Sequence, residues 1–162
     1  MRQNNHEFVA KSSRWMMRSG TIITALLGLA ATSAAIEPVP YPPGTVLLLV
    51  AGWCAPCRGE LAQLDAIAQA AAPLSVRVML IDDDRSGRRM VATLPPPRRW
   101  EPDPAIHAAA RVALLARTPG LPYSVAIGAD GRICAEQRGG LDALRARALV
   151  MRCRALHRGV AP

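Results

Sequence analysis

Residues 45–61 read TVLLLVAGWCAPCRGEL and change from strand to helix character at a pair of cysteines. Residues 46–50 form a short apolar run of valine and leucine, which predicts a strand buried on both faces. Cys54 and Cys57 follow at the start of a helical pattern, and Pro56 suits a first helical turn because it has no N–H to lose. Free N–H groups and the helix dipole stabilise a thiolate at such a position. The stretch therefore predicts a reversible disulfide at a strand-to-helix switch.

The helical spacing after the cysteines separates the two sulfur atoms. Cys57 recurs at helical intervals with Leu61 and Leu64, so these residues share one face, which must pack on the sheet. We therefore expect Cys57 to point inward and Cys54 to lie at the exposed end of the helix. An accessible attacking thiol and a shielded resolving thiol are what thiol–disulfide exchange requires.

The letters WCAPCRGEL resemble the WCxPCRxE motif of TlpA/ResA-type periplasmic thiol-disulfide oxidoreductases, which belong to the thioredoxin superfamily. The resemblance implies that Cys54 is the nucleophile, that Cys57 is the resolving cysteine and that Glu60 is the acid that serves the pair. It also implies that Trp53 and Pro56 contact the substrate. A CxxC pair that follows an apolar strand and opens an amphipathic helix is a more specific signal than the spacing alone.

The chain departs from many thioredoxins at Leu48, six residues before Cys54, where those proteins place a buried acid. Glu60 is then the only obvious carboxylate beside the cysteines. Its alternative role is to stabilise the first turn of the helix through the helix dipole.

The same resemblance implies a thioredoxin-like α/β fold, with a central mixed β-sheet flanked by helices. Residues 75–81 read SVRVMLI and predict a second strand, parallel to the first because a helix connects them. Leu121 and Pro122 precede a further apolar strand and resemble the cis-proline element of the family, which lies against the CxxC and contacts substrate. Tyr123 stands where the family commonly has threonine, and this leaves the shape of the substrate groove open.

The last part of the chain predicts a hairpin and a helix. Residues 125–127 and 132–136 flank an Asp-Gly turn, which is a hairpin signal. A helix over residues 141–157 should follow, and its core stripe is predicted to be Leu141, Leu144, Ala148 and Met151. Cys134 and Cys153 fall in the second hairpin strand and in this helix. They can form a structural disulfide or remain two free thiols.

Between the second and third strands, the sequence predicts two helices and a loop. Residues 82–84 are three aspartates, which we expect to end a strand and cap a helix over residues 85–93 rather than to bind a metal. Residues 94–104 read LPPPRRWEPDP and predict an irregular loop with an exposed Trp100, either a rigid surface loop or a partner-recognition loop. The helix after it carries His107, which is expected to be a plain surface residue without a role.

The N-terminal residues 1–35 have the pattern of a targeting segment. Their first half is polar and basic, and residues 20–35 are uncharged and mostly apolar but shorter than the roughly 20 residues of a membrane span. Small residues permit cleavage before Ile36, so a cleaved signal peptide is favoured over an uncleaved signal anchor. Residues 36–44 then predict a proline-rich linker, and residues 45–157 the thioredoxin-like domain.

Charge and composition narrow the class of partner. The formal net charge is +8, and the arginines that carry it are spread without the interleaved aromatic residues of nucleic-acid-binding proteins. From this distribution of arginines we expect that the protein does not bind nucleic acid. A solvated basic surface is favoured, and attraction to an anionic membrane or to acidic clients is the alternative.

Together these features predict an exported, periplasmic oxidoreductase that exchanges disulfides with protein clients through Cys54 and Cys57 and needs no cofactor. The resemblance favours the direction of a reductant and implies a membrane-linked electron donor. Membrane attachment is expected only if the N-terminal segment is not cleaved. The alternatives are a copper-delivery or other metal-binding protein, which could add the Cys153-x3-His157 spacing to the CxxC, and a client-binding module with little turnover.

Overall fold

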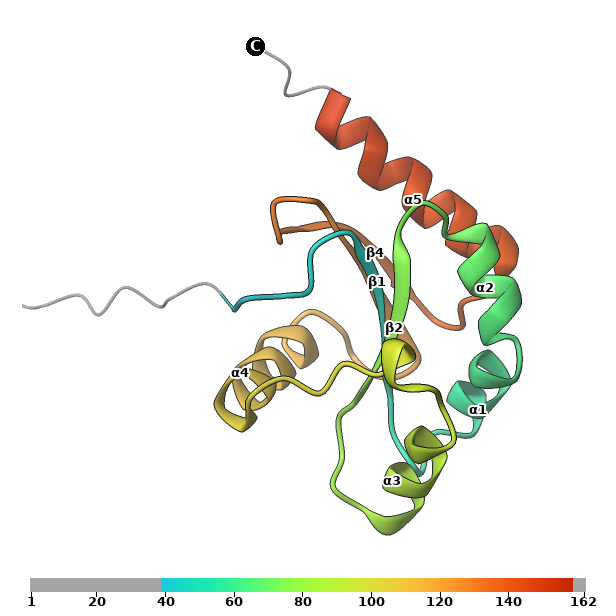
Figure 1. The fold of residues 1–162 in the computed structure, drawn as a ribbon, viewed down its shortest axis with the longest axis vertical. Helices are drawn as coiled ribbons and strands as arrows, with labels where there is room; N and C mark the ends of the chain where they lie inside the picture. The colour runs from blue at the N-terminus through green and yellow to red at the C-terminus, as the bar shows by residue number, and fades with distance from the viewer. Residues whose placement is uncertain (1–38, 159–162) are drawn as a thin grey trace, which may run out of the picture. The chain divides into compact units, whose positions relative to one another are not determined.

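The computed structural model describes residues 39–158, whose fold is drawn in Figure 1. The four strands are β1 (Thr45–Val50), β2 (Ser75–Leu80), β3 (Tyr123–Ile127) and β4 (Ile133–Arg138). The helices are α1 (Ala55–Ala62), α2 (Leu64–Ala70), α3 (Arg85–Ala92), the 3₁₀ helix η1 (Pro96–Arg98), α4 (Pro104–Leu115) and α5 (Ala143–Arg158). The predicted targeting segment, residues 1–35, lies outside the described residues.

The strands form one mixed sheet in the order β2-β1-β3-β4. Strand β1 pairs in parallel with β2 and antiparallel with β3, and β3 pairs antiparallel with β4. Helix α4 covers one face of the sheet, and α1, α2 and α5 lie on the other (Figure 1). A mixed sheet between helices, with the CxxC helix directly after the central strand β1, is the thioredoxin-like fold that the sequence predicted.

The core forms around β1, because this strand lies in the middle of the sheet and is covered on both faces. All six of its residues are buried. Because both faces of β1 are covered, its valine and leucine residues form an uninterrupted run. A strand with only one covered face would alternate apolar and polar residues. Helix α5 packs on the sheet and on α2 through one stripe of residues, Ala146, Leu149, Val150 and Cys153.

This packing corrects the predicted core stripe of α5. Leu141 is buried just before the helix, but Leu144 is 78% exposed and Met151 is 56% exposed. The helix carries two apolar stripes on opposite sides, and periodicity alone does not distinguish them. The disulfide between Cys134 in β4 and Cys153 in α5 turns the other stripe toward the sheet.

The helix after the cysteines is divided in two, whereas the spacing of Cys57, Leu61 and Leu64 predicted one continuous helix. Gln63 leaves the helical region, with φ −109° and ψ 13°, so α1 ends before it and α2 begins after it. The second helix buries Leu64 and Ile67. Leu61, expected on the core face, is only half-buried.

Two predictions for the connection between β2 and β3 are wrong. Trp100 is buried: its backbone N–H donates to the carbonyl of Val78 at 2.9 Å, and the centre of its ring lies 6.2 Å from that of Tyr41. His107 is half-buried, with Nε2 2.9 Å from the carbonyl oxygen of Leu80. The loop between α3 and α4 is thus attached to the edge strand β2. The prediction that the aspartates cap a helix is correct, since Asp84 is the N-cap of α3.

The end of the predicted linker belongs to the folded domain. Val39 and Tyr41 pack against the core, and Gly44 N–H donates to the carbonyl of Gly128 at 3.0 Å. Gly44 has a φ of +62°, which favours glycine at the turn into β1. Among residues 39–158, no helix is both long and apolar enough to cross a membrane.

Candidate redox site

Cys54 and Cys57 are joined by a disulfide at the N-terminus of α1, with their Cα atoms 5.3 Å apart. Cys54 is the N-cap of this helix, and its Sγ accepts a hydrogen bond from the N–H of Cys57 at 3.2 Å. The expectation that Cys54 is exposed is wrong for this disulfide form, in which it is only 2% exposed. The N–H of Cys54 donates to the carbonyl of Ala51 at 3.1 Å, which closes the turn before the helix. Trp53, beside it, is 66% exposed.

The turn before the cysteines is fixed by hydrogen bonds from both sides. The N–H of Gly52 donates to Oδ2 of Asp82 at 2.8 Å, and the guanidinium of Arg58 donates to the carbonyl of Gly52 at 2.8 Å. A Cβ at Gly52 would lie 2.1 Å from Oγ of Ser86 and 2.5 Å from the backbone nitrogen of Gly87, so only glycine fits against the start of α3. Sequence reasoning missed the role of Asp82, although parallel neighbouring strands end at the same edge of a sheet and Asp82 follows β2 as Gly52 follows β1.

Glu60 lies one turn beyond Cys57 and is only 3% exposed. Its Oε1 accepts the N–H of Leu141, and Oε2 has no hydrogen-bond partner among residues 39–158. Burial raises the pKa of Glu60 to about 7, although the hydrogen bond from Leu141 acts in the opposite direction. A carboxyl with this pKa can take up or release a proton near neutral pH, which a plain first-turn carboxylate does not do.

Pro122 lies at the same end of the sheet as the cysteines. The Leu121–Pro122 peptide bond is cis, and Pro122 is buried while Leu121 is half-buried. The next residue, Tyr123, is opposite Leu49 in the sheet, so the proline faces the end of β1 where the chain enters the CxxC turn. The carbonyl oxygen of Leu49 also lies 3.9 Å from Sγ of Cys57. The register of β1 and β3 therefore brings the cis-proline element and the cysteines together.

Tyr123 is buried at the inner end of a polar network that reaches the surface at Arg117. The residue is fully buried, and its hydroxyl donates to Oε2 of Glu136 at 2.8 Å. Nε of Arg117 donates to the other carboxylate oxygen at 2.8 Å. Burial, followed by the bond to Glu136, raises the pKa of Tyr123 to about 12. Burial alone would raise the pKa of Glu136, but the bonds from Arg117 and Tyr123 lower it below its ordinary value. The network ties β3, directly after Pro122, to β4 and to the end of α4.

The other two cysteines also form a disulfide. Cys134 in β4 and Cys153 in α5 are bonded, with their Cα atoms 4.8 Å apart. Cys153 is consequently not free to join the CxxC in a metal site. The described part of the chain contains no group of three or more histidine, cysteine, aspartate or glutamate residues that could hold a metal ion.

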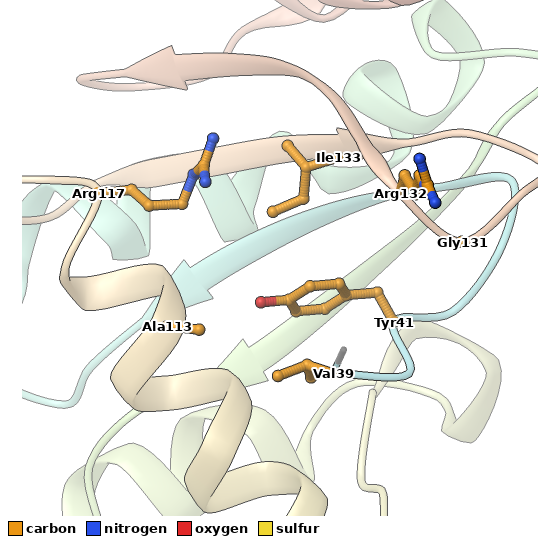
Figure 2. A pocket seen from close by; sticks show the side chains of 7 residues that line it. All are labelled: Val39, Tyr41, Ala113, Arg117, Gly131, Arg132 and Ile133. Carbon is orange, nitrogen blue, oxygen red and sulfur yellow. The ribbon is translucent and has the colours of Figure 1, made fainter. Parts of the chain in front are cut away.

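A pocket of about 280 Å³ lies away from the cysteines. Figure 2 shows the ring of Tyr41 pointing into it, between Ala113 of α4 and Ile133 of β4. Cys54, Cys57, Glu60 and Pro122 do not line this pocket.

Comparison with known proteins gave structural similarities only. No family model and no curated protein matches the chain. The reduced N-terminal domain of PilB from N. meningitidis is 20% identical, with 70% of this chain and 83% of that chain covered and a TM-score of 0.49. StoA from Bacillus subtilis is 16% identical, with coverages of 67% and 84% and a TM-score of 0.44. A secreted Mycobacterium tuberculosis disulfide oxidoreductase homologous to E. coli DsbE is 22% identical, with coverages of 70% and 83% and a TM-score of 0.41.

Proposed function

We propose that this chain is a thiol-disulfide oxidoreductase of the TlpA/ResA type that exchanges disulfides with protein clients through Cys54 and Cys57. The observation that carries the proposal is the position of this disulfide at the N-terminus of α1, one turn from the buried carboxyl of Glu60. Thiol exchange needs a stabilised thiolate, a second thiol within bonding distance and a group that accepts or donates a proton near neutral pH. The site supplies each of these from its own residues.

The exchange follows in two steps when the reduced pair acts on a client disulfide. The Cys54 thiolate attacks one client sulfur, which forms a mixed disulfide and releases the other client sulfur as a thiolate. Cys57 then loses its proton and attacks the Cys54 sulfur, which forms the Cys54–Cys57 disulfide and releases the second client thiolate. Two electrons pass from the pair to the client, and the reverse sequence oxidises a client dithiol.

Glu60 and the helix terminus support different steps. The N–H of Cys57 points at Sγ of Cys54, where it stabilises negative charge before the first attack. Glu60 takes up the proton that Cys57 must lose before the second attack, because a carboxyl with a pKa of about 7 is partly ionised at neutral pH. Its contact with Leu141 keeps the carboxyl at this position.

Client contact is assigned to the surface around the sulfurs. Trp53 and Pro56 are exposed on the CxxC side, and Leu121 is half-buried beside Pro122. An extended client segment next to Pro122 would use main-chain hydrogen bonds, as in recognition by strand addition. Such contacts are largely independent of sequence, which suits a protein with several clients.

The proposed direction of electron transfer and the proposed cellular location rest on the sequence and not on the geometry of the site. We propose that the chain acts as a reductant in an exported, periplasmic position and receives electrons from a membrane-linked donor. The pattern of residues 1–35 supports export as a signal peptide or as an anchor. A reduction potential well below that of the glutathione pool would support the reductant direction, and a potential well above it would refute this part of the proposal.

The proposal is tested with single cysteine variants and a disulfide-bonded peptide. Cys54→Ser should abolish peptide reduction, whereas Cys57→Ser should still attack and accumulate the mixed disulfide, measured by mass spectrometry. Peptide reduction by the Cys54→Ser variant at the wild-type rate would rule out the assigned chemistry.

The role of Glu60 has a separate test. Glu60→Gln should slow the second step by about tenfold or more and remove the pH dependence near 7 from that step. Asp65→Asn, which changes an exposed acid on α2, is the matched control and should leave the rate unchanged. Equal kinetics in the wild type and in Glu60→Gln would leave Glu60 with a purely structural role.

A further inference from the structure

Helix α5 carries an apolar stripe that the fold does not use. The buried stripe of Ala146, Leu149, Val150 and Cys153 faces the sheet and α2. On the opposite side of the helix, Leu144, Ala148 and Met151 recur at helical spacing and are all exposed. A surface helix of a globular domain ordinarily has one apolar stripe, so the outer stripe of α5 is not accounted for by the core.

The charges of α5 are of one sign only. The helix reads ALRARALVMRCRALHR and contains arginines but no acidic residue. Arg145 and Arg152 are engaged with the protein itself, through the carbonyls of Gly140 and Glu136. Arg147 and Arg154 make no ion pair or hydrogen bond of their side chains within residues 39–158.

Helical geometry places these free arginines beside the outer stripe. Arg147 and Arg154 are seven residues apart, so they share one side of the helix, next to Leu144 and Met151. Arg145 and Arg152 have the same spacing and flank the stripe on its other side. The outer surface of α5 therefore consists of an apolar strip with cations along both margins.

We propose that this outer surface of α5 docks on a membrane surface that contains anionic lipids, with the helix axis parallel to the bilayer. An interfacial helix buries its apolar stripe at the boundary of headgroups and acyl chains, and here Arg147 and Arg154 along one margin contact the lipid phosphates. Residues 37–162 carry a formal net charge of +5, which adds a long-range attraction to such a surface. The proposal goes beyond thiol exchange, because Cys54, Cys57 and Glu60 take no part in it.

Charge complementarity favours a membrane surface over two other possible partners of α5, a second copy of the chain and an acidic protein. A second copy of the chain that packed α5 against α5 would bring the arginines of both copies together without an acidic residue on either helix, which is unfavourable. An acidic protein would satisfy the arginines but gives no reason for an apolar stripe that runs between them. An anionic bilayer surface matches both features at once, since it offers phosphates beside an apolar layer.

The test uses the chain from Glu37 onward, because this part forms a compact unit by itself and lacks the apolar residues 20–35. Binding is measured by flotation with vesicles of phosphatidylglycerol and phosphatidylcholine, and with vesicles of phosphatidylcholine alone. We expect binding to the anionic vesicles only, and weaker binding at high salt.

Two paired variants and two controls locate the surface. Arg147→Gln with Arg154→Gln, and Leu144→Ser with Met151→Ser, should each weaken vesicle binding by about tenfold. Arg89→Gln with Arg111→Gln removes the same charge from exposed positions on α3 and α4, and Val112→Ser changes an apolar residue that is 72% exposed on α4. Both controls should bind within about twofold of the wild type, and thiol exchange should be unchanged in every variant.

Each other outcome overturns the proposal. Equal binding to both kinds of vesicle, or an equal loss in the α3 and α4 control, would mean that α5 is not the docking surface. Binding to polyglutamate without binding to vesicles would assign the surface to an acidic protein. Self-association that the α5 variants abolish, without vesicle binding, would assign it to a second copy of the chain.

Discussion

At the scale of single residues, the buried carboxyl of Glu60 couples the stability of the domain to pH. Its pKa rises from 4.5 to about 7 on folding. The folded form therefore binds the proton more tightly, and the stabilisation is complete below pH 4.5 and is lost as the pH rises through 7. The free energy of unfolding of the oxidised chain should fall by about 3 kcal/mol across this window, at 1.36 kcal/mol for each unit of pKa.

Glu60→Gln checks this pH dependence, because the amide stays neutral and its oxygen can still accept the N–H of Leu141. Urea unfolding at pH 4.5, 6 and 8 should show a flat profile for the variant and a declining profile for the wild type. A wild-type profile without the decline would mean that folding does not raise the pKa of Glu60.

The reactivity of Cys54 is a second property of a single residue. In the reduced protein, Cys54 should react with an alkylating agent near neutral pH, because its Sγ occupies the N-cap position and receives the N–H of Cys57. The midpoint of its rate against pH should lie below the value of about 8.5 for a free thiol. A midpoint near that of a free thiol would contradict the assignment of Cys54 as the attacking thiol.

At the scale of elements, the close packing of the CxxC turn on the start of α3 makes glycine indispensable at one position. Gly52→Ala should destabilise the domain by about 2 kcal/mol or more, because the new Cβ would lie 2.5 Å from the backbone nitrogen of Gly87. Gly59 lies within α1 and has nothing within 4 Å of a Cβ. Gly59→Ala is therefore the matched control and should stabilise the helix by about 0.5–1 kcal/mol. Chemical denaturation of both variants measures the difference, and equal effects would refute the close packing.

At the scale of the whole molecule, the second disulfide links the last strand to the last helix. Cys134→Ser with Cys153→Ser opens a loop of about 20 residues and should lower the free energy of unfolding by about 3 kcal/mol. Thiol exchange at Cys54 should continue in this variant at temperatures where it remains folded. Loss of exchange in a folded variant would instead connect the second disulfide to the chemistry.

Much of the fold could be predicted because its signals are local. The apolar run of β1, the CxxC that opens α1 and the Asp-Gly turn of the hairpin each lie within a few residues of the structure that they specify. The parallel pairing of β1 with β2 was also predicted correctly, because a helical crossover leaves few alternatives.

The sequence by itself determined that two thiols stand at a helix N-terminus after a buried strand, since spacing and periodicity are properties of neighbouring residues. Only the tertiary structure decided which side of α5 faces the core, that Trp100 is covered by Tyr41, and that Glu60 is shielded from water beside Leu141. Periodicity defines the faces of an element, but burial depends on which distant segment covers each face. The raised pKa of Glu60, and with it the proposed proton transfer, therefore arises from burial in the folded domain, and the hydrogen bond from Leu141, 81 positions away in the chain, acts against this rise.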